Sequence, residues 1–163
     1  MESEPLPRLR PLALAATLLG VASSTMAGPQ ASKAKDIYPE PAVAKAEIRA
    51  AVARAKREHK RVILDFGGNW CGDCRVLDRY FHQEPNASLL RANFVLVSVN
   101  IGKFDQNKDV VKTYGATLDK GVPALAVLDA EGKTLFSQKN GEFESMRSLQ
   151  PSALTEFLDH WKG

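Results

Sequence analysis

Apolar positions along the chain follow two alternating periods. Residues 61–66 and 94–99 are short, nearly continuous apolar runs, which are typical of buried strands. Residues 123–128 and 133–138 predict two further strands, because the Asp129–Gly132 segment between them favours a hairpin turn. The early strands need helical crossovers and are expected to pair in parallel, whereas the last two form an antiparallel hairpin.

Helical spacing separates these strands. Residues 42–59 are rich in good helix formers and predict an amphipathic helix with a small-residue face. Shorter helices are predicted at residues 74–81, 85–92 and 105–114, the last of them ended by Gly115. Residues 140–150 are predicted to be a polar connection. Residues 151–161 then place apolar side chains at helical spacing, at Leu154, Phe157, Leu158 and Trp161.

This order of elements predicts one α/β domain. We expect a three-layer sandwich, in which a central mixed sheet of about four strands carries helices on both faces. The length of 163 residues, with 44% hydrophobic and 25% charged residues, suits one ordinary domain with its own core. A net charge of +3 with no long basic run argues against a dedicated nucleic-acid binder.

The first 27 residues have the pattern of a secretory signal peptide. Arg8 and Arg10 precede an apolar stretch, and small residues then lead to Ala27. The stretch has about 11 residues, whereas a bilayer span needs about 20, although an uncleaved anchor is the alternative interpretation. Residues 28–41 are predicted to be a flexible leader, and residues 42–163 the folded domain. The signal predicts export to an oxidising compartment.

The two cysteines, Cys71 and Cys74, predict a redox site. Cys71 follows a predicted strand and a glycine loop at the opening of a helix, where backbone N–H groups favour its thiolate. Cys74 lies one helical turn further on, and it can resolve a mixed disulfide formed by Cys71.

Three other interpretations of the cysteine pair are weaker. A structural disulfide that closes so short a loop removes little chain entropy. A zinc half-site needs two more ligands, and the three histidines are not spaced to supply them. A c-type haem site needs a histidine directly after the second cysteine, where Arg75 stands.

Residues 65–74 (Asp-Phe-Gly-Gly-Asn-Trp-Cys-Gly-Asp-Cys) resemble the active-site segment of the thioredoxin superfamily. Residues 121–124 (Gly-Val-Pro-Ala) resemble the segment that leads into the family's cis-proline loop. The similarity covers about residues 42–162. It implies a thioredoxin-like fold and a thiol–disulfide oxidoreductase that needs no bound cofactor and no metal.

The resemblance also assigns roles to particular residues. Asp65 matches the family's buried acid, and a raised pKa would let it accept the proton of Cys74. The alternative is a strand-end aspartate that faces solvent. Pro123 matches the cis-proline that faces the cysteines and exposes the Val122 backbone to a substrate strand. Trp70 matches the aromatic residue before the first cysteine, where it contacts partners or packs in the core.

Gly72 and Asp73, between the cysteines, complete the expected substrate-binding surface. Three residues depart from the family pattern: Gly67 replaces a common tryptophan, Ser98 a common lysine near the buried acid, and Asp73 the usual proline. The Asp73 charge should oppose thiolate formation, and Arg75 is a candidate to offset it. The sequence thus predicts a Cys71 pKa near or above that of ordinary thioredoxins, and hence a reducing protein.

The sequence therefore predicts an exported, monomeric enzyme that reduces protein disulfides in a bacterial periplasm. Its electrons would come from a membrane-bound donor, since that compartment has no soluble NADPH route. We expect no nucleic-acid partner and no stable membrane insertion after signal cleavage. Two alternatives are a disulfide-forming or isomerising oxidoreductase and a non-catalytic binding module with a thioredoxin fold.

Overall fold

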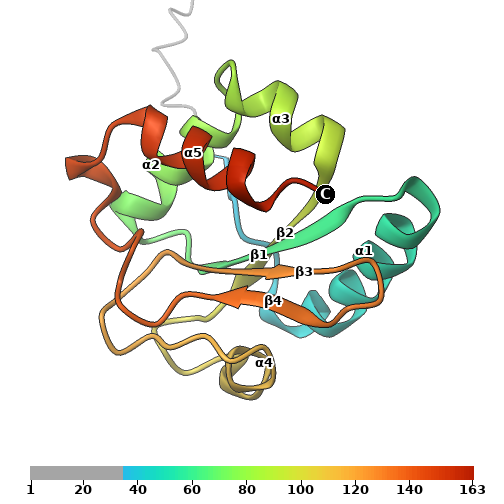
Figure 1. Cartoon of the computed structure of the whole chain (residues 1–163). Coiled ribbons are helices and arrows are strands. Elements are labelled where there is room, and N and C mark those ends of the chain that lie inside the picture. Colours follow the sequence, from blue (N-terminus) through green and yellow to red (C-terminus); the bar gives the residue numbers. More distant parts are fainter. Residues whose placement is uncertain (1–34) are drawn as a thin grey trace, which may run out of the picture. The chain divides into compact units, whose positions relative to one another are not determined.

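The computed structural model describes residues 35–163, so the predicted signal peptide lies outside the described residues. A mixed sheet of four strands in the order β2-β1-β3-β4 forms the middle layer (Figure 1). Strand β1 pairs in parallel with β2 and antiparallel with β3, and β4 is antiparallel to β3. The strand bounds are Arg61–Gly67 for β1, Phe94–Asn100 for β2, Ala124–Leu128 for β3 and Thr134–Ser137 for β4.

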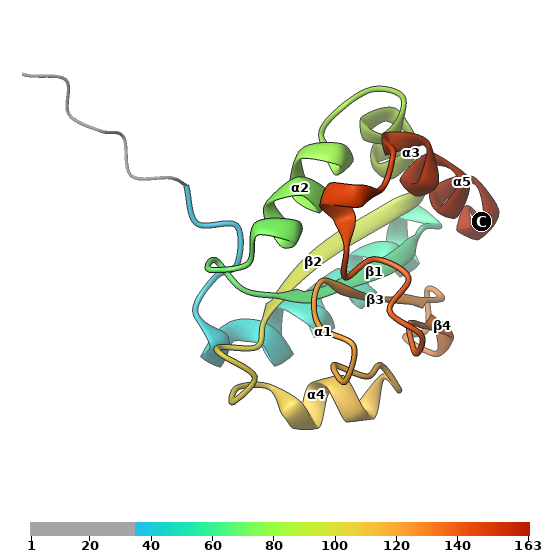
Figure 2. The ribbon, with the colours of Figure 1, turned by 90° about the vertical axis from the view of Figure 1, so that its left-hand side faces the viewer.

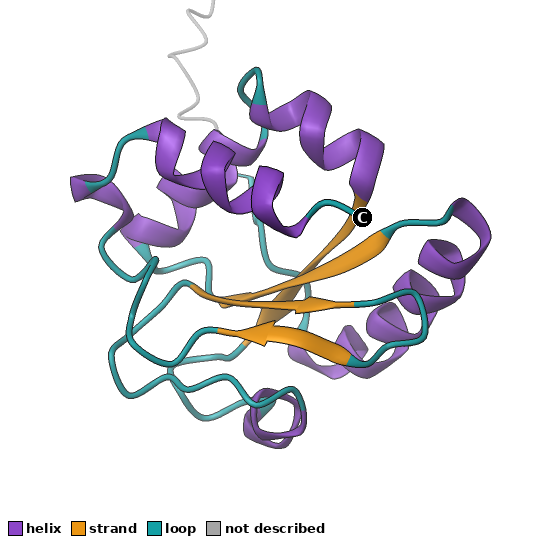
Figure 3. Cartoon of the chain, viewed as in Figure 1, coloured by secondary structure: helices purple, strands orange, loops and turns teal. Residues whose placement is uncertain are grey.

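Helices cover both faces of this sheet, which confirms the predicted sandwich (Figure 3). Helices α1 and α4 pack on one face, and α2, α3 and α5 on the other. None of the helices in residues 35–163 is long and apolar enough to cross a membrane. The helix bounds are Ala44–Glu58, Gly72–Phe81, Asn86–Asn93, Lys108–Thr113 and Pro151–Trp161 for α1 to α5.

The pleat of β1 divides its side chains between the two cores. Val62, Leu64 and Phe66 face the core under α1 and α4, whereas Ile63 faces the core under α2 and α5. Asp65 alternates with these residues and so lies on the same side as Ile63. A carboxyl group thus stands on a central strand, on the side covered by α2.

The sequence predicted the parallel β1–β2 pair and the β3–β4 hairpin, but not that β3 lies beside β1. Burial patterns show that a strand is covered without showing which neighbour it pairs with. The helix predicted at residues 105–114 is shorter, because Phe104 and Asn107 have left-handed φ angles of 68° and 51° that do not continue a helix. Residues 140–150 were predicted to be a polar connection, but this segment also contributes two side chains to the core, because Phe143 and Met146 are buried.

The flexible-leader interpretation is wrong for residues 35–41. Tyr38 is 1% exposed and belongs to the core. Three asparagine side chains hold the surrounding backbone: Asn69 bonds the backbone at residues 37 and 38, Asn100 donates to the Pro39 carbonyl, and Asn107 to the Pro41 carbonyl. The prediction rested on a composition rich in Gly, Pro and Ser, and it did not take into account the one aromatic residue, Tyr38, that anchors the segment. Figure 2 shows this segment running alongside the domain before α1 begins.

We expect Asn86→Ala to destabilise the domain by about 2 kcal/mol. The buried Asn86 side chain donates to the backbone carbonyls of Tyr80 and Pro151 and accepts from the Thr155 hydroxyl, so it joins α3 to α5. Its loss would leave these polar groups without their partner. Urea unfolding measures the effect, with the exposed Asn140→Ala as the control. Equal midpoints for the two variants would contradict the assigned role.

Candidate active site

The cysteine pair lies where the loop after β1 leads into the first turn of α2 (Figure 2). Cys71 is the N-cap residue of α2, with extended backbone angles of −83° and 117°. Its sulfur lies 3.0 Å from the backbone nitrogen of Cys74, which donates to it. The two sulfurs form a disulfide, and their Cα atoms are 5.3 Å apart. An N–H aimed at the sulfur at a helix N-terminus stabilises a thiolate when the pair is reduced.

The two cysteines differ in their access to solvent. Cys71 keeps 5% of its surface exposed, whereas Cys74 is fully buried. The residual exposure of Cys71 fits the attacking role, and the burial of Cys74 the resolving role, that the sequence predicts for them.

Pro123 faces this pair from the other side of the site. The Val122–Pro123 peptide is cis, and the Val122 carbonyl oxygen lies 3.5 Å from the Cys71 sulfur. Gln138, which is 1% exposed, donates to the Pro123 carbonyl and accepts from the Leu125 N–H. Gln138 thus ties the loop to the start of β3. No pattern in the sequence singles out this residue, because a glutamine at a strand end is ordinary.

Asp65 is buried, so the alternative of a solvent-facing aspartate is excluded. Its Oδ2 accepts a hydrogen bond of 2.8 Å from the Tyr38 hydroxyl. The pKa of Asp65 is raised to about 7: burial raises it, the Tyr38 hydrogen bond lowers it by a smaller amount, and the negative charge of Asp78 adds a further increase. A carboxyl group with such a pKa can accept or release a proton near neutral pH.

Gly67 explains how these groups come together. A Cβ at this position would lie under 3 Å from both the Tyr38 hydroxyl and the Cys74 sulfur. Tyr38 and the Cys74 sulfur therefore occupy the space that a side chain at position 67 would need. Tyr38 itself was missed by the sequence reasoning, because it lies 27 positions before its partner Asp65 in a segment without periodicity.

The expectation that Arg75 offsets the charge of Asp73 is wrong. Arg75 donates instead to the backbone carbonyls of Asn69 and Lys35. Arg147 holds Asp73 through its guanidinium, with nitrogen–oxygen distances of 2.9 and 3.1 Å, and through its backbone N–H. These contacts lower the pKa of the Asp73 carboxyl. Arg147 lies 74 positions further along the chain, where helix spacing gives no signal.

Trp70 is 48% exposed, so it does not pack in the core. Its indole N–H donates to the Gly102 carbonyl, and its ring centre lies 5.5 Å from that of Phe104, which is 39% exposed. Gly72 is also exposed, under the Arg147 guanidinium. An apolar surface thus adjoins the cysteines on one side and a paired charge adjoins them on the other.

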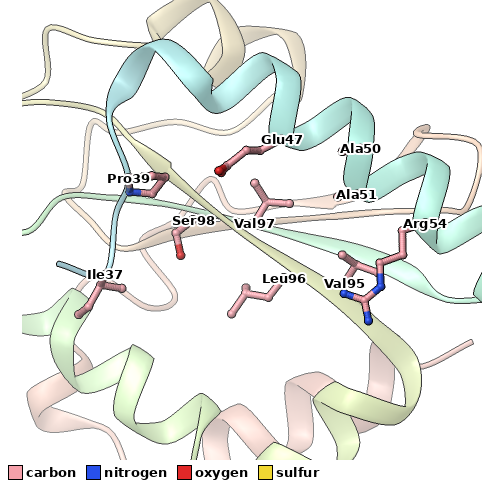
Figure 4. A pocket seen from close by; sticks show the side chains of 10 residues that line it. All are labelled: Ile37, Pro39, Glu47, Ala50, Ala51, Arg54, Val95, Leu96, Val97 and Ser98. Atoms are coloured by element: carbon pink, nitrogen blue, oxygen red, sulfur yellow. The ribbon is translucent and has the colours of Figure 1, made fainter. Parts of the chain in front are cut away.

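Ser98 replaces the lysine that many thioredoxins have near the acid. It pairs with Asp65 across the two parallel strands. It also lines two cavities beside β2, one of about 440 Å³ between α1 and β2 (Figure 4) and one of about 620 Å³ beside α2. No cysteine lines either cavity. Within residues 35–163, no group of three or more His, Cys, Asp or Glu side chains is placed to hold a metal ion.

The family model described as thioredoxin-like matches residues 43–130, which is more than half of the chain. This chain therefore belongs to the thioredoxin-like family of disulfide oxidoreductases, and it carries a cysteine pair of the redox type. A solved structure described as a disulphide isomerase from Xylella fastidiosa Temecula1 is 33% identical, with a TM-score of 0.72 over 78% of this chain and 98% of that one. A thioredoxin from Thermus thermophilus, 18% identical with a TM-score of 0.51, shares the fold.

Curated relatives include the thiol:disulfide interchange protein DsbD of Vibrio cholerae. It is 30% identical over 115 residues, which make up 70% of this chain and 17% of that protein. The DsbD of Photorhabdus laumondii is 26% identical over 94 residues. The chain thus spans about a sixth of the length of these relatives.

We expect Asp65→Asn to become more stable than the natural protein as pH rises. The folded-state pKa of about 7 lies above the ordinary value of 3.8, so the folded protein keeps a proton that the unfolded chain has released. This contribution to stability is complete below pH 4 and is lost as pH rises through 7. Between pH 4 and 8, the variant should gain about 4 kcal/mol relative to the natural protein.

Urea unfolding of the oxidised protein at several pH values measures this difference. The exposed Asp119→Asn is the control, and its stability should follow that of the natural protein. A constant difference between Asp65→Asn and the natural protein at all pH values would show that the carboxyl titrates normally.

We expect Arg147→Ala to raise the pKa of the Cys71 thiol by about half a unit, because the Asp73 charge is then uncompensated beside it. Adding Asp73→Asn to this variant should restore the natural value. The rate of iodoacetamide alkylation of the reduced protein against pH measures the thiol. Arg79→Ala, at an exposed arginine in the last turn of α2, should leave the curve in place. A shift that persists in the double variant would contradict the charge argument.

Proposed function

We propose that this protein reduces disulfide bonds in other proteins through a Cys71–Cys74 dithiol cycle. The observation that carries the proposal is the position of Cys71, which keeps 5% of its surface exposed, caps a helix N-terminus and faces the Val122 carbonyl. An extended substrate strand that pairs with the Val122 backbone would bring its own disulfide to the Cys71 sulfur.

The cycle balances without a bound cofactor. The Cys71 thiolate attacks one substrate sulfur, forms a mixed disulfide and releases the other sulfur as a thiolate, which takes a proton from water. Cys74 then gives up its proton and attacks the Cys71 sulfur. The Cys71–Cys74 bond forms, and the electron pair leaves on the remaining substrate sulfur. The substrate gains two electrons and two protons, and the protein ends as the disulfide found in this structure.

The reducing direction is supported by the charges at the helix N-terminus. Asp73 already places a carboxylate in the first turn of α2, where it competes with a thiolate for the same positive end of the helix. Arg147 weakens that competition without removing the charge. A less acidic Cys71 thiol stabilises the reduced state less than the strongly acidic thiol of an oxidising enzyme does. We therefore expect a potential closer to the thioredoxin value of about −270 mV than to the value of about −120 mV of a strong oxidant.

Isomerisation is a second candidate, because the Xylella structure that covers most of this chain is described as a disulphide isomerase. Equilibration with glutathione separates the two directions. A reduction potential well below the glutathione poise supports disulfide reduction, and a potential of about −180 mV supports isomerisation.

Export completes the proposal. Residues 1–27 have the signal-peptide pattern, and relatives carry the name thiol:disulfide interchange protein DsbD. We place the protein in the periplasm as a monomer that receives its electrons from a membrane-bound donor and binds no nucleic acid. A fusion of residues 1–41 to a reporter enzyme that is active only after export tests the compartment, and a cytoplasmic reporter would contradict it.

We expect Cys71→Ser to lose at least a hundredfold of the insulin-reducing rate, since no other described cysteine can attack. Cys74→Ser should instead accumulate a mixed disulfide with its substrate. The exposed Ser152→Ala in α5 serves as a control that should keep the natural rate. Turbidity of reduced insulin and mass spectrometry of the trapped adduct measure the two outcomes. Activity that survives in Cys71→Ser would contradict the dithiol cycle, whereas a natural protein that reduces no insulin would support the binding-module interpretation.

A further inference from the structure

We propose that Tyr38 is the positioning residue for the resolving step: its hydroxyl favours the ionised form of Asp65 through a hydrogen bond to Oδ2 and leaves Oδ1 to take the proton of Cys74. The proposal rests on the proposed dithiol cycle. It gives a role to a residue that lies before the region matched by the family and outside the predicted domain.

The geometry brings three groups to one place. Asp65 and Gly67 are two positions apart on β1, so both point to the side covered by α2. The space above Gly67 holds the Tyr38 hydroxyl and the Cys74 sulfur. The same hydroxyl donates to Asp65 Oδ2 at 2.8 Å. The buried acid, its donor and the resolving sulfur are therefore close neighbours.

The Tyr38 hydroxyl can act only as a neutral donor near neutral pH. Burial and the nearby Asp65 charge raise the pKa of Tyr38 well above its ordinary value. Its single proton is committed to Oδ2. Asp65 Oδ1 is buried and accepts no hydrogen bond from any part of the chain that the structure describes. Oδ1 is thus the oxygen left to receive a proton.

The other groups around Asp65 do not favour its charge. Asp78 of α2 opposes ionisation, and the strand neighbours of Asp65, Ser98 on β2 and Leu125 on β3, are uncharged. Arg75 of α2 is directed to backbone carbonyls.

Further out, Asp36, Asp78 and His82 line the cavity beside Ser98. Within residues 35–163, the Tyr38 hydroxyl is the side-chain contact that stabilises the Asp65 carboxylate. A neutral hydroxyl thereby stands in for the cation that the Ser98 position does not supply.

The active-site loop itself holds Tyr38 in place. Asn69 Oδ1 accepts from the backbone N–H groups of Ile37 and Tyr38, and Asn69 Nδ2 donates to the Tyr38 carbonyl. Asn69 lies two residues before Cys71. The position of the hydroxyl is therefore set by the same loop that positions the cysteines.

The proton moves as follows in the resolving step. The Cys74 thiol gives its proton to Asp65 Oδ1 while its sulfur bonds to Cys71. The electron pair of the mixed disulfide leaves on the substrate sulfur. The protonated Asp65 then releases its proton to solvent, which returns the carboxylate for the next cycle.

The test is Tyr38→Phe, which removes one oxygen and keeps the ring. The titration midpoint of the Asp65 carboxyl should rise by about one pH unit or more, because a hydrogen bond to the charged form is lost. Carboxyl infrared or ¹³C signals of the oxidised protein, assigned with Asp65→Asn, report this midpoint without any substrate. The pH profile of the resolving step, followed by rapid mixing with a fluorescent peptide disulfide, should shift by the same amount and be roughly fivefold slower at pH 7.

Tyr80→Phe is the matched control. Tyr80 is also a partly buried tyrosine whose hydroxyl donates a hydrogen bond, in its case to the Leu149 carbonyl. This variant should lose comparable stability and leave both pH midpoints in place. Equal midpoints in Tyr38→Phe and the natural protein would overturn the proposal, even if Tyr38→Phe is less stable.

Asn69→Ala supplies a second variant if Tyr38→Phe does not fold. It loosens the Tyr38 backbone, and it should shift the carboxyl midpoint in the same direction by a smaller amount. Asn93→Ala, which removes a side-chain bond to a carbonyl within α3, should not shift it. An unshifted midpoint in Asn69→Ala would also count against the proposal. A natural protein that titrates as expected but reduces no disulfide would refute the proposed function and not the coupling of Tyr38 to Asp65.

Discussion

Burying a carboxyl group on a central strand is costly, and much of the site is arranged around that cost. Asp65 has both strand neighbours uncharged, and burial raises its pKa by disfavouring the carboxylate. One hydroxyl hydrogen bond brings its pKa back to about 7. A neighbouring cation would lower the pKa of Asp65 further, and the carboxylate would then be a weak base. Without any partner, the carboxyl group would stay protonated. The neutral donor keeps the group able to change its state in the range where thiols exchange.

This balance depends on parts of the chain that are far apart in sequence. Strand β1 supplies the acid, Gly67 leaves the space, and the segment before α1 fills it with Tyr38. On the other side of the cysteines, the loop between β4 and α5 supplies Arg147 to Asp73. Both contributions neutralise or moderate a carboxylate next to the cysteine pair. The motif that carries the cysteines is short, but the side chains that act on its carboxyl groups come from segments near both ends of the domain.

The sequence predicted what local patterns encode. Apolar runs located β1 and β2, helical spacing located α5 at its observed bounds, and the spacing of Asp65, the cysteines and Pro123 predicted one shared site. These features depend on residues that lie close together or on a resemblance over several motifs. The antiparallel pairing of β1 with β3 was not predictable in this way, because burial is equal for several strand orders.

The contacts that were missed have a common physical reason. Tyr38, Gln138 and Arg147 each act through hydrogen bonds or an ion pair to residues far away along the chain, and such isolated contacts leave no period in the sequence. The assignment of Arg75 to Asp73 failed for the same reason. Arg75 lies two residues after Asp73 and is therefore the nearest cation along the chain. Its side chain, however, is held by the backbone carbonyls of Lys35 and Asn69.

The family match ends at residue 130 and begins at residue 43, so it excludes both Tyr38 and Arg147. The matched part of the molecule thus contains the cysteine pair and Asp65, while the flanking segments contribute the two side chains that lower the pKa of its carboxyl groups. Two members with the same Trp-Cys-Gly-Asp-Cys segment can therefore differ in chemical behaviour through residues that no alignment of the motif compares. A version of this protein cut to residues 43–130 would lose β4 and α5 and, with them, both side chains that set the proton affinity of these two carboxyl groups.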